Sequence, residues 1–155
     1  MTGKKSQAMK RVLFLCTGNY YRSRFSELFF NWHAKQRDLG WKADSRGLAL
    51  APWNIGPISS DTVARLLHHG IRIRARQRFP IIAHQKDFEA AAHIVALKRT
   101  EHRPMIEARF SSWLDRVEFW EVHDLDFAGP EEALPQIESE VMELIGRLAD
   151  GSGRE

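Results

Sequence analysis

The chain has 155 residues, of which 43% are hydrophobic, enough to bury the core of one compact domain. Its 23 basic and 20 acidic residues leave a net charge of only +3, which permits an anionic ligand but does not indicate nucleic acid. No apolar run approaches the ~20 residues of a membrane span, and no signal peptide is evident. We therefore expect a soluble, cytoplasmic monomer or weak dimer with no membrane or nucleic-acid partner. A single domain is expected at residues 11–150, between a disordered leader at 1–10 and a disordered tail at 151–155.

The predicted elements alternate between strands and helices. Residues 11–16 form an apolar, β-prone run that predicts a buried parallel strand, and a helix follows to about Gln36 with Ser23 as its N-cap. Further strands are predicted at 41–50, 93–97 and 117–122, and further helices at 59–70, 101–110 and 131–148. This alternation predicts a three-layer α/β fold, in which helices cover both faces of a four-stranded parallel sheet.

Cys16 is the only cysteine, so an internal disulfide and a zinc cluster of thiolates are both excluded. The sequence also lacks a metal-ligand cluster and the glycine motifs of nucleotide-binding loops, so no metal or cofactor is expected. A lone cysteine is usually an inert buried side chain. The question is whether the surroundings of this one would stabilise a thiolate.

The segment between the first strand and the first helix, residues 16–23, reads CTGNYYRS. A loop of this length can wrap its N–H groups around one point, at which the positive end of the following helix is also aimed. Arg22, six positions after Cys16, can hold two oxygens of a bound phosphate with its planar fork. The same field would stabilise a thiolate and make Cys16 a nucleophile. Asp124 follows the last strand and is expected on the same rim of the sheet.

This segment resembles the signature loop of the low-molecular-weight protein tyrosine phosphatases, and the similarity extends over residues 11–150. Outside the loop it includes Glu27, Asp44-Ser45, Trp53-Asn54, Gly56-Pro57, His69-Gly70-Ile71, Ala75-Arg76-Gln77, Asp87-Phe88 and Val122-His123-Asp124. The resemblance implies the flavodoxin-like fold of that family. It also implies hydrolysis of a phosphotyrosine protein or a small aryl phosphate through a cysteinyl-phosphate, with inorganic phosphate or sulfate able to occupy the loop.

The resemblance further implies roles for individual residues. Cys16 would attack phosphorus, Arg22 would stabilise the transition state, and Asp124 would act as general acid and then as general base. Asp126 is the alternative acid. The residues implied to contact substrate or phosphate are Thr17, Gly18, Asn19, Tyr20, Tyr21, Ser23, Trp53 and Phe127, and those implied to support the loop are Ser45 and His69.

Several positions depart from the family pattern. Tyr21 stands where most members have a second cysteine, so Cys16 lacks a thiol partner that would protect it from overoxidation. Arg24 replaces a proline, and Leu125 replaces the proline after the catalytic aspartate. Lys98 replaces an aspartate that would interact with His69.

These departures leave a second hypothesis open, a pseudophosphatase that binds phosphate or a phosphoprotein with little or no turnover. An arsenate reductase shares the fold, but it relays electrons through further cysteines, which this chain lacks. The segment between Gln77 and Asp87 is longer than usual, and is expected to be either an extended loop or a partner surface.

Overall fold

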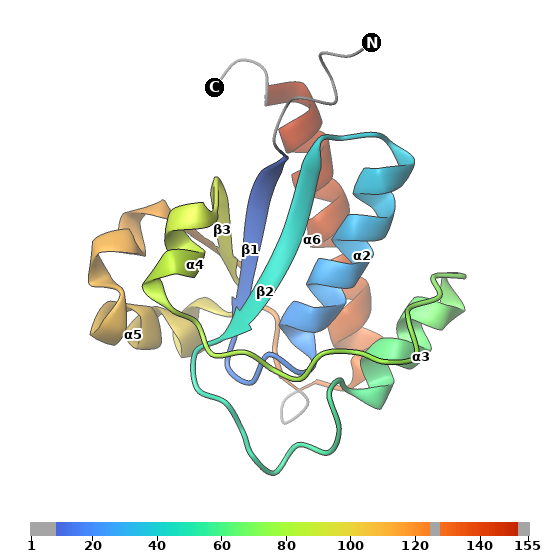
Figure 1. Ribbon diagram of the computed structural model, residues 1–155, viewed down its shortest axis with the longest axis horizontal. Helices are drawn as coiled ribbons and strands as arrows, with labels where there is room; N and C mark the ends of the chain where they lie inside the picture. Colours follow the sequence, from blue (N-terminus) through green and yellow to red (C-terminus); the bar gives the residue numbers. More distant parts are fainter. Residues whose placement is uncertain (1–8, 125–127, 152–155) are drawn as a thin grey trace.

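The computed structural model describes residues 9–124 and 128–151. One sheet of four parallel strands has the order β2-β1-β3-β4. The strands are β1 (Lys10–Cys16), β2 (Trp41–Gly47), β3 (His93–Ala96) and β4 (Val117–Phe119). One face of the sheet is covered by α2 (Arg22–Gln36) and α6 (Pro130–Gly151), and the other by α4 (Gln85–Ala90) and α5 (Arg99–Arg109) (Figure 1). The predicted three-layer α/β fold is confirmed.

The central strand β1 carries side chains into two separate cores. Val12, Phe14 and Cys16 belong to the core beneath α2 and α6, whereas Leu13 and Leu15 belong to the core beneath α4 and α5. All five side chains are buried. A strand buried on both faces has no polar side to alternate with, which is why the sequence shows a continuous apolar run. The strand therefore fixes Cys16 at its carboxyl end, on the α2 side of the sheet.

The longest helix, α6, packs against the sheet with the spacing that the sequence predicted. Ile137, Val141, Leu144 and Ile145 are all fully buried in the same core as β1. The shorter α3 (Ser60–His68) packs beside α2 and α6. No helix within residues 9–124 and 128–151 is long and apolar enough to cross a membrane.

The start of α2 differs from the prediction. The helix begins at Arg22, and its N-cap residue Tyr21 makes no side-chain capping hydrogen bond. The Ser23 hydroxyl instead accepts a hydrogen bond from Asn19 and lies 2.9 Å from the sulfur of Cys16. The expectation that Ser23 caps the helix is therefore wrong, because the preceding loop uses its hydroxyl.

Two short elements were not predicted, namely α4 and the 3₁₀ helix η1 (Ser111–Arg116). The longer segment between Gln77 and Asp87 leads into α4 and lies against the end of β2. There the Gly47 N–H donates to the Ile81 carbonyl, and the Ala83 N–H donates to the Gly47 carbonyl, both at 2.8 Å. The segment thus extends the edge of the sheet beside the Cys16 loop.

Candidate active site

The loop of residues 16–22 turns several carbonyl groups away from its centre. Four of its carbonyl oxygens accept hydrogen bonds of 2.9–3.1 Å from groups outside the loop. The backbone N–H groups of Leu48, Ala49 and Ser59 donate to the carbonyls of Cys16, Thr17 and Tyr20, respectively. The Thr62 hydroxyl donates to the carbonyl of Tyr21. Within a trans peptide the C=O and the N–H point in opposite directions, so the N–H groups that follow these carbonyls point away from those partners. The result is a cradle of N–H groups suited to an anion.

The sulfur of Cys16 lies at the base of this cradle, 2.9 Å from the Ser23 hydroxyl oxygen. Asn19 donates to the same oxygen at 2.9 Å, so one acceptor site of the hydroxyl is occupied and its proton can point to the sulfur. A thiolate can only accept a hydrogen bond, so Ser23 is then the donor. Both side chains are buried. Ser23 is therefore placed to stabilise the ionised form of Cys16.

Asn19 organises the lower half of the loop. Its backbone has a φ of +53°, a left-handed conformation that asparagine tolerates better than most residues. Its amide nitrogen donates to the hydroxyls of Ser23 and Ser45, each at 2.9 Å. Its amide oxygen accepts from the Arg78 guanidinium and the Ile81 N–H, each at 3.0 Å. All four hydrogen-bonding positions of the amide are used, which holds the loop in one shape.

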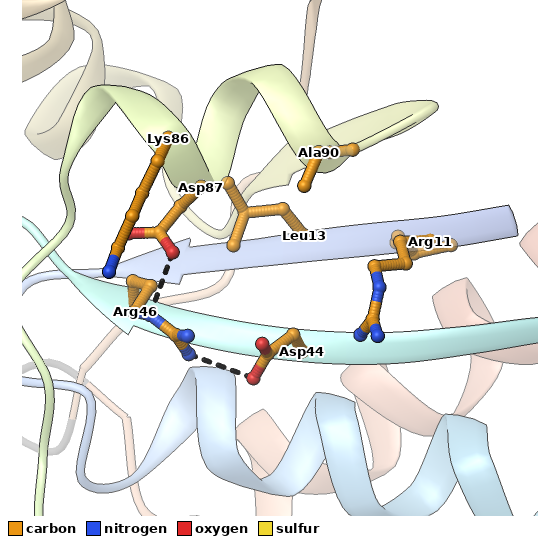
Figure 2. A pocket seen from close by; sticks show the side chains of 9 residues that line it. Arg11, Leu13, Asp44, Arg46, Lys86, Asp87 and Ala90 are labelled. Atoms are coloured by element: carbon orange, nitrogen blue, oxygen red, sulfur yellow. Dashed lines mark hydrogen bonds and ion pairs between the residues drawn. The ribbon is translucent and has the colours of Figure 1, made fainter.

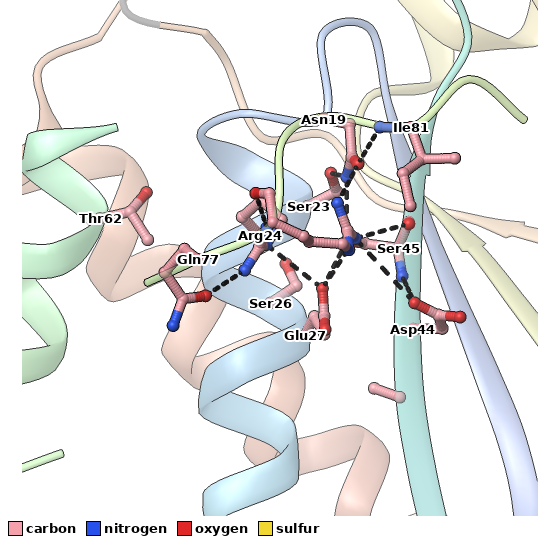
Figure 3. Close-up of polar contacts among 12 residues, drawn as sticks. Asn19, Ser23, Arg24, Ser26, Glu27, Asp44, Ser45, Thr62, Gln77 and Ile81 are labelled. Carbon is pink, nitrogen blue, oxygen red and sulfur yellow. Dashed lines mark hydrogen bonds and ion pairs between the residues drawn. The ribbon is translucent and has the colours of Figure 1, made fainter. Parts of the chain in front are cut away.

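A largely buried network of polar and charged side chains lies under the loop (Figure 3). We call it the underside network; its members are Asn19, Ser23, Arg24, Glu27, Ser45 and Arg78. The Ser45 hydroxyl donates to Glu27 at 2.6 Å and accepts from Arg78 at 3.1 Å. Glu27 also lies 3.4 Å from both Arg24 and Arg78. Burial raises the pKa of Glu27, and the hydroxyl and the two guanidinium groups partly offset that rise.

Three charged groups meet on the opposite side of the loop, and we call Arg22, Glu101 and Asp124 the mouth groups. The Arg22 side chain is only 2% exposed, and its two terminal nitrogens each lie 3.1 Å from one oxygen of Glu101. An oxygen of Asp124 lies 3.6 Å from the same guanidinium. Burial alone would lower the pKa of Arg22, but the negative charges of Cys16, Glu101 and Asp124 outweigh it and raise that pKa.

A cavity of about 310 Å³ opens over the loop and brings most of the predicted residues together. Cys16, Arg22 and Asp124 line it with the aromatic residues Tyr20 and Trp53. The Tyr20 hydroxyl donates to a carbonyl of the neighbouring loop, while Trp53 is 79% exposed. The cavity thus combines the sulfur of Cys16 with the charged mouth groups and two aromatic side chains.

Some predicted residues are placed elsewhere. His69 does not reach the loop, because the end of α3 packs on α6 and its ring nitrogen lies 2.8 Å from Glu138 there. Its expected support of the loop is therefore not seen among the described contacts. Asp126, the alternative acid, and Phe127 lie outside the described residues.

Sequence reasoning assigned no role to Glu101, His102 or Arg78, although each contacts the loop. Glu101 and His102 lie near the start of α5, the helix after β3, at the same carboxyl edge as Cys16, and that position was the available signal. Arg78 carried no comparable signal. It lies in a segment without regular structure and meets Asn19 across 59 residues of sequence.

A second cavity, of about 330 Å³, lies between the strands and α4 (Figure 2). Arg46 is paired there with Asp44 at 2.8 Å and with Asp87 at 3.2 Å. Its guanidinium is therefore already engaged by carboxylates. This cavity holds no nucleophilic cysteine or cradle of N–H groups, so we assign the chemistry to the cavity over Cys16.

Comparisons with known proteins agree with this geometry. The family model for low molecular weight phosphotyrosine protein phosphatases matches residues 11–152, so the chain belongs to that family and is a phosphatase. No curated protein sequence matches.

Solved structures of similar proteins cover nearly the whole chain. YfkJ from Bacillus subtilis is 23% identical over 97% of this chain and 99% of its own, with a TM-score of 0.76. A low molecular weight protein tyrosine phosphatase from T. tengcongensis is 27% identical over 91% of this chain and 98% of its own, with a TM-score of 0.71. The YwlE arginine phosphatase from Geobacillus stearothermophilus is 25% identical over 93% of each chain, with a TM-score of 0.68.

Proposed function

We propose that the chain hydrolyses phosphotyrosine and other aryl phosphate monoesters through a cysteinyl-phosphate on Cys16. The observation that carries the proposal is the meeting of a sulfur, an arginine fork and a carboxylate in one cavity, supplied by Cys16, Arg22 and Asp124. Ser23 stands 2.9 Å from the sulfur as a hydrogen-bond donor for the thiolate. Each group has the chemical character that transfer of phosphate to sulfur requires.

In the first step the Cys16 thiolate attacks phosphorus. A sulfur–phosphorus bond forms as the bond between phosphorus and the aryl oxygen breaks, and protonated Asp124 gives its proton to the departing phenolate. Arg22 and the N–H cradle stabilise the charge that spreads over the three remaining phosphate oxygens.

In the second step water attacks phosphorus. The ionised Asp124 takes a proton from that water, the sulfur–phosphorus bond breaks, and the thiolate and inorganic phosphate are released. The same carboxyl group serves both steps because it lines the cavity on the substrate side of Arg22, 3.6 Å from the guanidinium.

The shape of the cavity favours an aromatic phosphate. Cys16 is only 2% exposed and lies below a rim that carries Tyr20 and Trp53. A phosphotyrosine side chain is long enough to reach a recessed sulfur and can stack on these rings, whereas phosphoserine is shorter and has no ring.

Phosphoarginine is a second candidate substrate. The mouth contains two carboxylates, Glu101 and Asp124, which can face a cationic guanidinium leaving group. The YwlE arginine phosphatase from Geobacillus stearothermophilus is also among the similar structures. Tyr20 and Trp53 at the rim place this candidate second, because they match an aryl group better.

Hydrolysis of a chromogenic aryl phosphate, followed across pH, tests the proposal. The folded wild-type protein is expected to turn over, and Cys16→Ser is expected to lose activity. Phosphotyrosine, phosphoserine and phosphoarginine peptides compared in the same assay separate the candidate substrates. Phosphate binding without turnover by the wild type would favour the pseudophosphatase hypothesis instead.

The assignment of the general acid needs its own comparison. Asp124→Asn is expected to lower kcat by roughly 10²–10⁴-fold, whereas Asp126→Asn should retain most activity. The opposite pattern would move the role to Asp126. The cytoplasmic location, the monomeric or weakly dimeric state and the lack of nucleic-acid and membrane partners stay predictions.

A further inference from the structure

The Arg22 guanidinium, which is expected to bind phosphate, also donates hydrogen bonds to groups of the protein. The two terminal nitrogens of its guanidinium each lie 3.1 Å from an oxygen of Glu101. One of these nitrogens also donates to the Val122 carbonyl at 3.1 Å. A carboxylate is thus held face to face with the arginine that is expected to bind phosphate.

Counting the donors shows what remains for a ligand. A guanidinium has five N–H groups: one on Nε and two on each terminal nitrogen. Glu101 occupies one on each terminal nitrogen, and Val122 occupies the second one on Nη1. Among the contacts of the described residues, the Nε–H and one N–H of Nη2 are left, and they share one edge of the plane. Two parallel donors on one edge suit bidentate binding of phosphate.

Arg22 lines the cavity over Cys16, so its unused edge is expected to face that cavity. Asp124 also lines the cavity, and its oxygen lies 3.6 Å from Nη2. This is too far for a hydrogen bond, but it places Nη2 beside the cavity. Cys16 lines the same cavity. The edge that Glu101 leaves open is therefore the edge that a phosphate on Cys16 would meet.

Glu101 is itself held in place from several sides. It lies in the first turn of α5, where the positive end of the helix favours a carboxylate. The Thr17 hydroxyl donates to the Glu101 oxygen that also faces Nη2. The Glu101 side chain is 26% exposed, so most of it is packed against its partners.

The neighbouring His102 completes this arrangement. Its Nδ1 accepts the backbone N–H of Lys98 at 3.0 Å, so in the neutral ring the proton is on Nε2. That Nε2 lies 3.1 Å from the Thr17 hydroxyl oxygen and 3.4 Å from Glu101. Burial lowers the pKa of this fully buried histidine, which favours the neutral ring. His102 thus directs the Thr17 hydroxyl proton toward Glu101.

We infer that Glu101 is the positioning residue for Arg22: its carboxylate fixes one edge of the guanidinium so that the other edge meets the phosphate. The inference deepens the proposed function and rests on it. Glu101 acts through Arg22 and takes no part in the bond changes. It also adds a negative charge near the cradle, so its benefit is expected in the transition state, where the geometry of Arg22 matters most.

The test uses Glu101→Gln, which keeps the size of the side chain and removes its charge. The matched control is Glu107→Gln, on the exposed side of the same helix. Glu101→Gln is expected to lower kcat by about 10–100-fold with less than about threefold change in KM, while Glu107→Gln behaves as wild type. Unchanged or higher kcat in a folded Glu101→Gln would overturn the inference, and a rise would mean that Glu101 competes with phosphate.

A second readout does not depend on turnover. Inorganic phosphate and vanadate are each expected to protect Cys16 from alkylation, and vanadate resembles the five-coordinate transition state more closely. In Glu101→Gln the preference for vanadate over phosphate is expected to fall by about 10-fold, because transition-state complementarity is lost. If protection by phosphate and protection by vanadate changed equally, Glu101 would act only through its charge, and the inference would be overturned.

The two readouts also separate the inference from the proposed function. A wild type without turnover would defeat the proposed function, while the protection ratio would still decide the role of Glu101. If Glu101→Gln does not fold, Thr17→Val replaces it, because it removes the hydroxyl that holds the carboxylate. The same loss of vanadate preference, several-fold in size, is then expected, and no loss would overturn the inference.

Discussion

The two sides of the loop are both rich in charge, yet they are built for different tasks. The mouth groups line a cavity, and Asp124 among them has a side chain that is 43% exposed. The underside network is closed off from that cavity and includes Arg24, whose side chain is 2% exposed. Charges at the mouth can act on a ligand directly, whereas charges underneath act only through the shape of the loop. Substitutions at the mouth should therefore affect catalysis most, and substitutions underneath should affect stability as well.

The difference also bears on the departures from the family pattern. Arg24, in place of a proline, donates to the side chain of Gln77 at 2.6 Å and to the carbonyl of Arg78 at 3.2 Å. Arg78 in turn reaches Asn19 at 3.0 Å. The longer segment that follows Gln77 thus joins the underside of the loop rather than standing apart from it. Phe79 in this segment remains 65% exposed.

Among the substitutions that compare the two sides of the loop, the largest effect on catalysis is expected at the mouth, from Arg22→Lys. Lysine keeps the positive charge but loses the planar fork that binds Glu101 and phosphate at the same time. We expect kcat/KM to fall by about 10²–10³-fold while the free energy of unfolding changes by less than about 2 kcal/mol. Steady-state kinetics and urea denaturation measure the two quantities. Activity within threefold of wild type would mean that a point charge is sufficient.

The next effect is expected underneath, from Arg78→Met. The Arg78 guanidinium donates to the amide oxygen of Asn19 and to the carbonyl of Ser45, each at 3.0 Å, and methionine removes both hydrogen bonds. We expect a loss of about 1–3 kcal/mol in the free energy of unfolding and a fall in kcat of about 10-fold. The control is Arg76→Met, at an exposed position two residues earlier. Equal behaviour of the two variants would remove Arg78 from the support of the loop.

Gly47→Ala tests the loop from the side of β2. An added Cβ would stand 2.8 Å from the Thr17 carbonyl oxygen and 3.1 Å from Asn19, so the loop would have to shift. We expect a loss of about 1–3 kcal/mol together with reduced activity. Gly146→Ala is the matched control, since nothing lies within 4 Å of its added Cβ. In the interior of α6 that change should stabilise by about 0.5–1 kcal/mol, and a destabilised control would weaken the comparison.

A smaller effect concerns the pH dependence of the Glu101 contribution to stability. Burial would raise the pKa of Glu101, but hydrogen bonds from His102, Arg22 and Thr17 outweigh it and hold that pKa well below the usual range. A lowered carboxyl pKa stabilises the folded state above the unfolded value of about 4.3, and the contribution is lost as the pH falls below it.

The measurement compares the free energy of unfolding of wild type and Glu101→Gln at several pH values. The difference between the two proteins should be largest near about pH 6 and should shrink toward about pH 3. A difference that stays constant over this range would show that the charge of Glu101 contributes nothing to stability.

The smallest effect is expected from Tyr21→Phe. The Tyr21 hydroxyl is buried and has no hydrogen-bond partner among the described residues. Burial and the nearby carboxylates of Asp61 and Asp124 raise its pKa, so the phenol stays neutral. Removing an unsatisfied hydroxyl should leave the free energy of unfolding unchanged or raise it by up to about 1 kcal/mol. A clearly lower unfolding temperature of Tyr21→Phe would instead reveal a hydrogen bond to that hydroxyl.

Local sequence predicted the strand, the loop and the following helix well, because neighbours in sequence specify them. The apolar run before Cys16, the turn residues after it and the apolar spacing of α6 each depend on a short stretch of chain. Even so, the cap assigned to Ser23 was wrong. A hydroxyl at a helix start has several possible partners, and local sequence does not show that Cys16 and Asn19 are nearer.

By itself, the sequence determined the fold class and the anion cradle, with Cys16 and Arg22 at its two ends. Only the tertiary structure decided which groups hold that cradle in shape. Glu101 meets Arg22 from 79 residues away, Arg78 meets Asn19 from 59 residues away, and His69 turns to Glu138 instead of the loop. The physical reason is that spacing along the chain specifies local backbone geometry, whereas ion pairs between distant segments depend on how strands and helices pack.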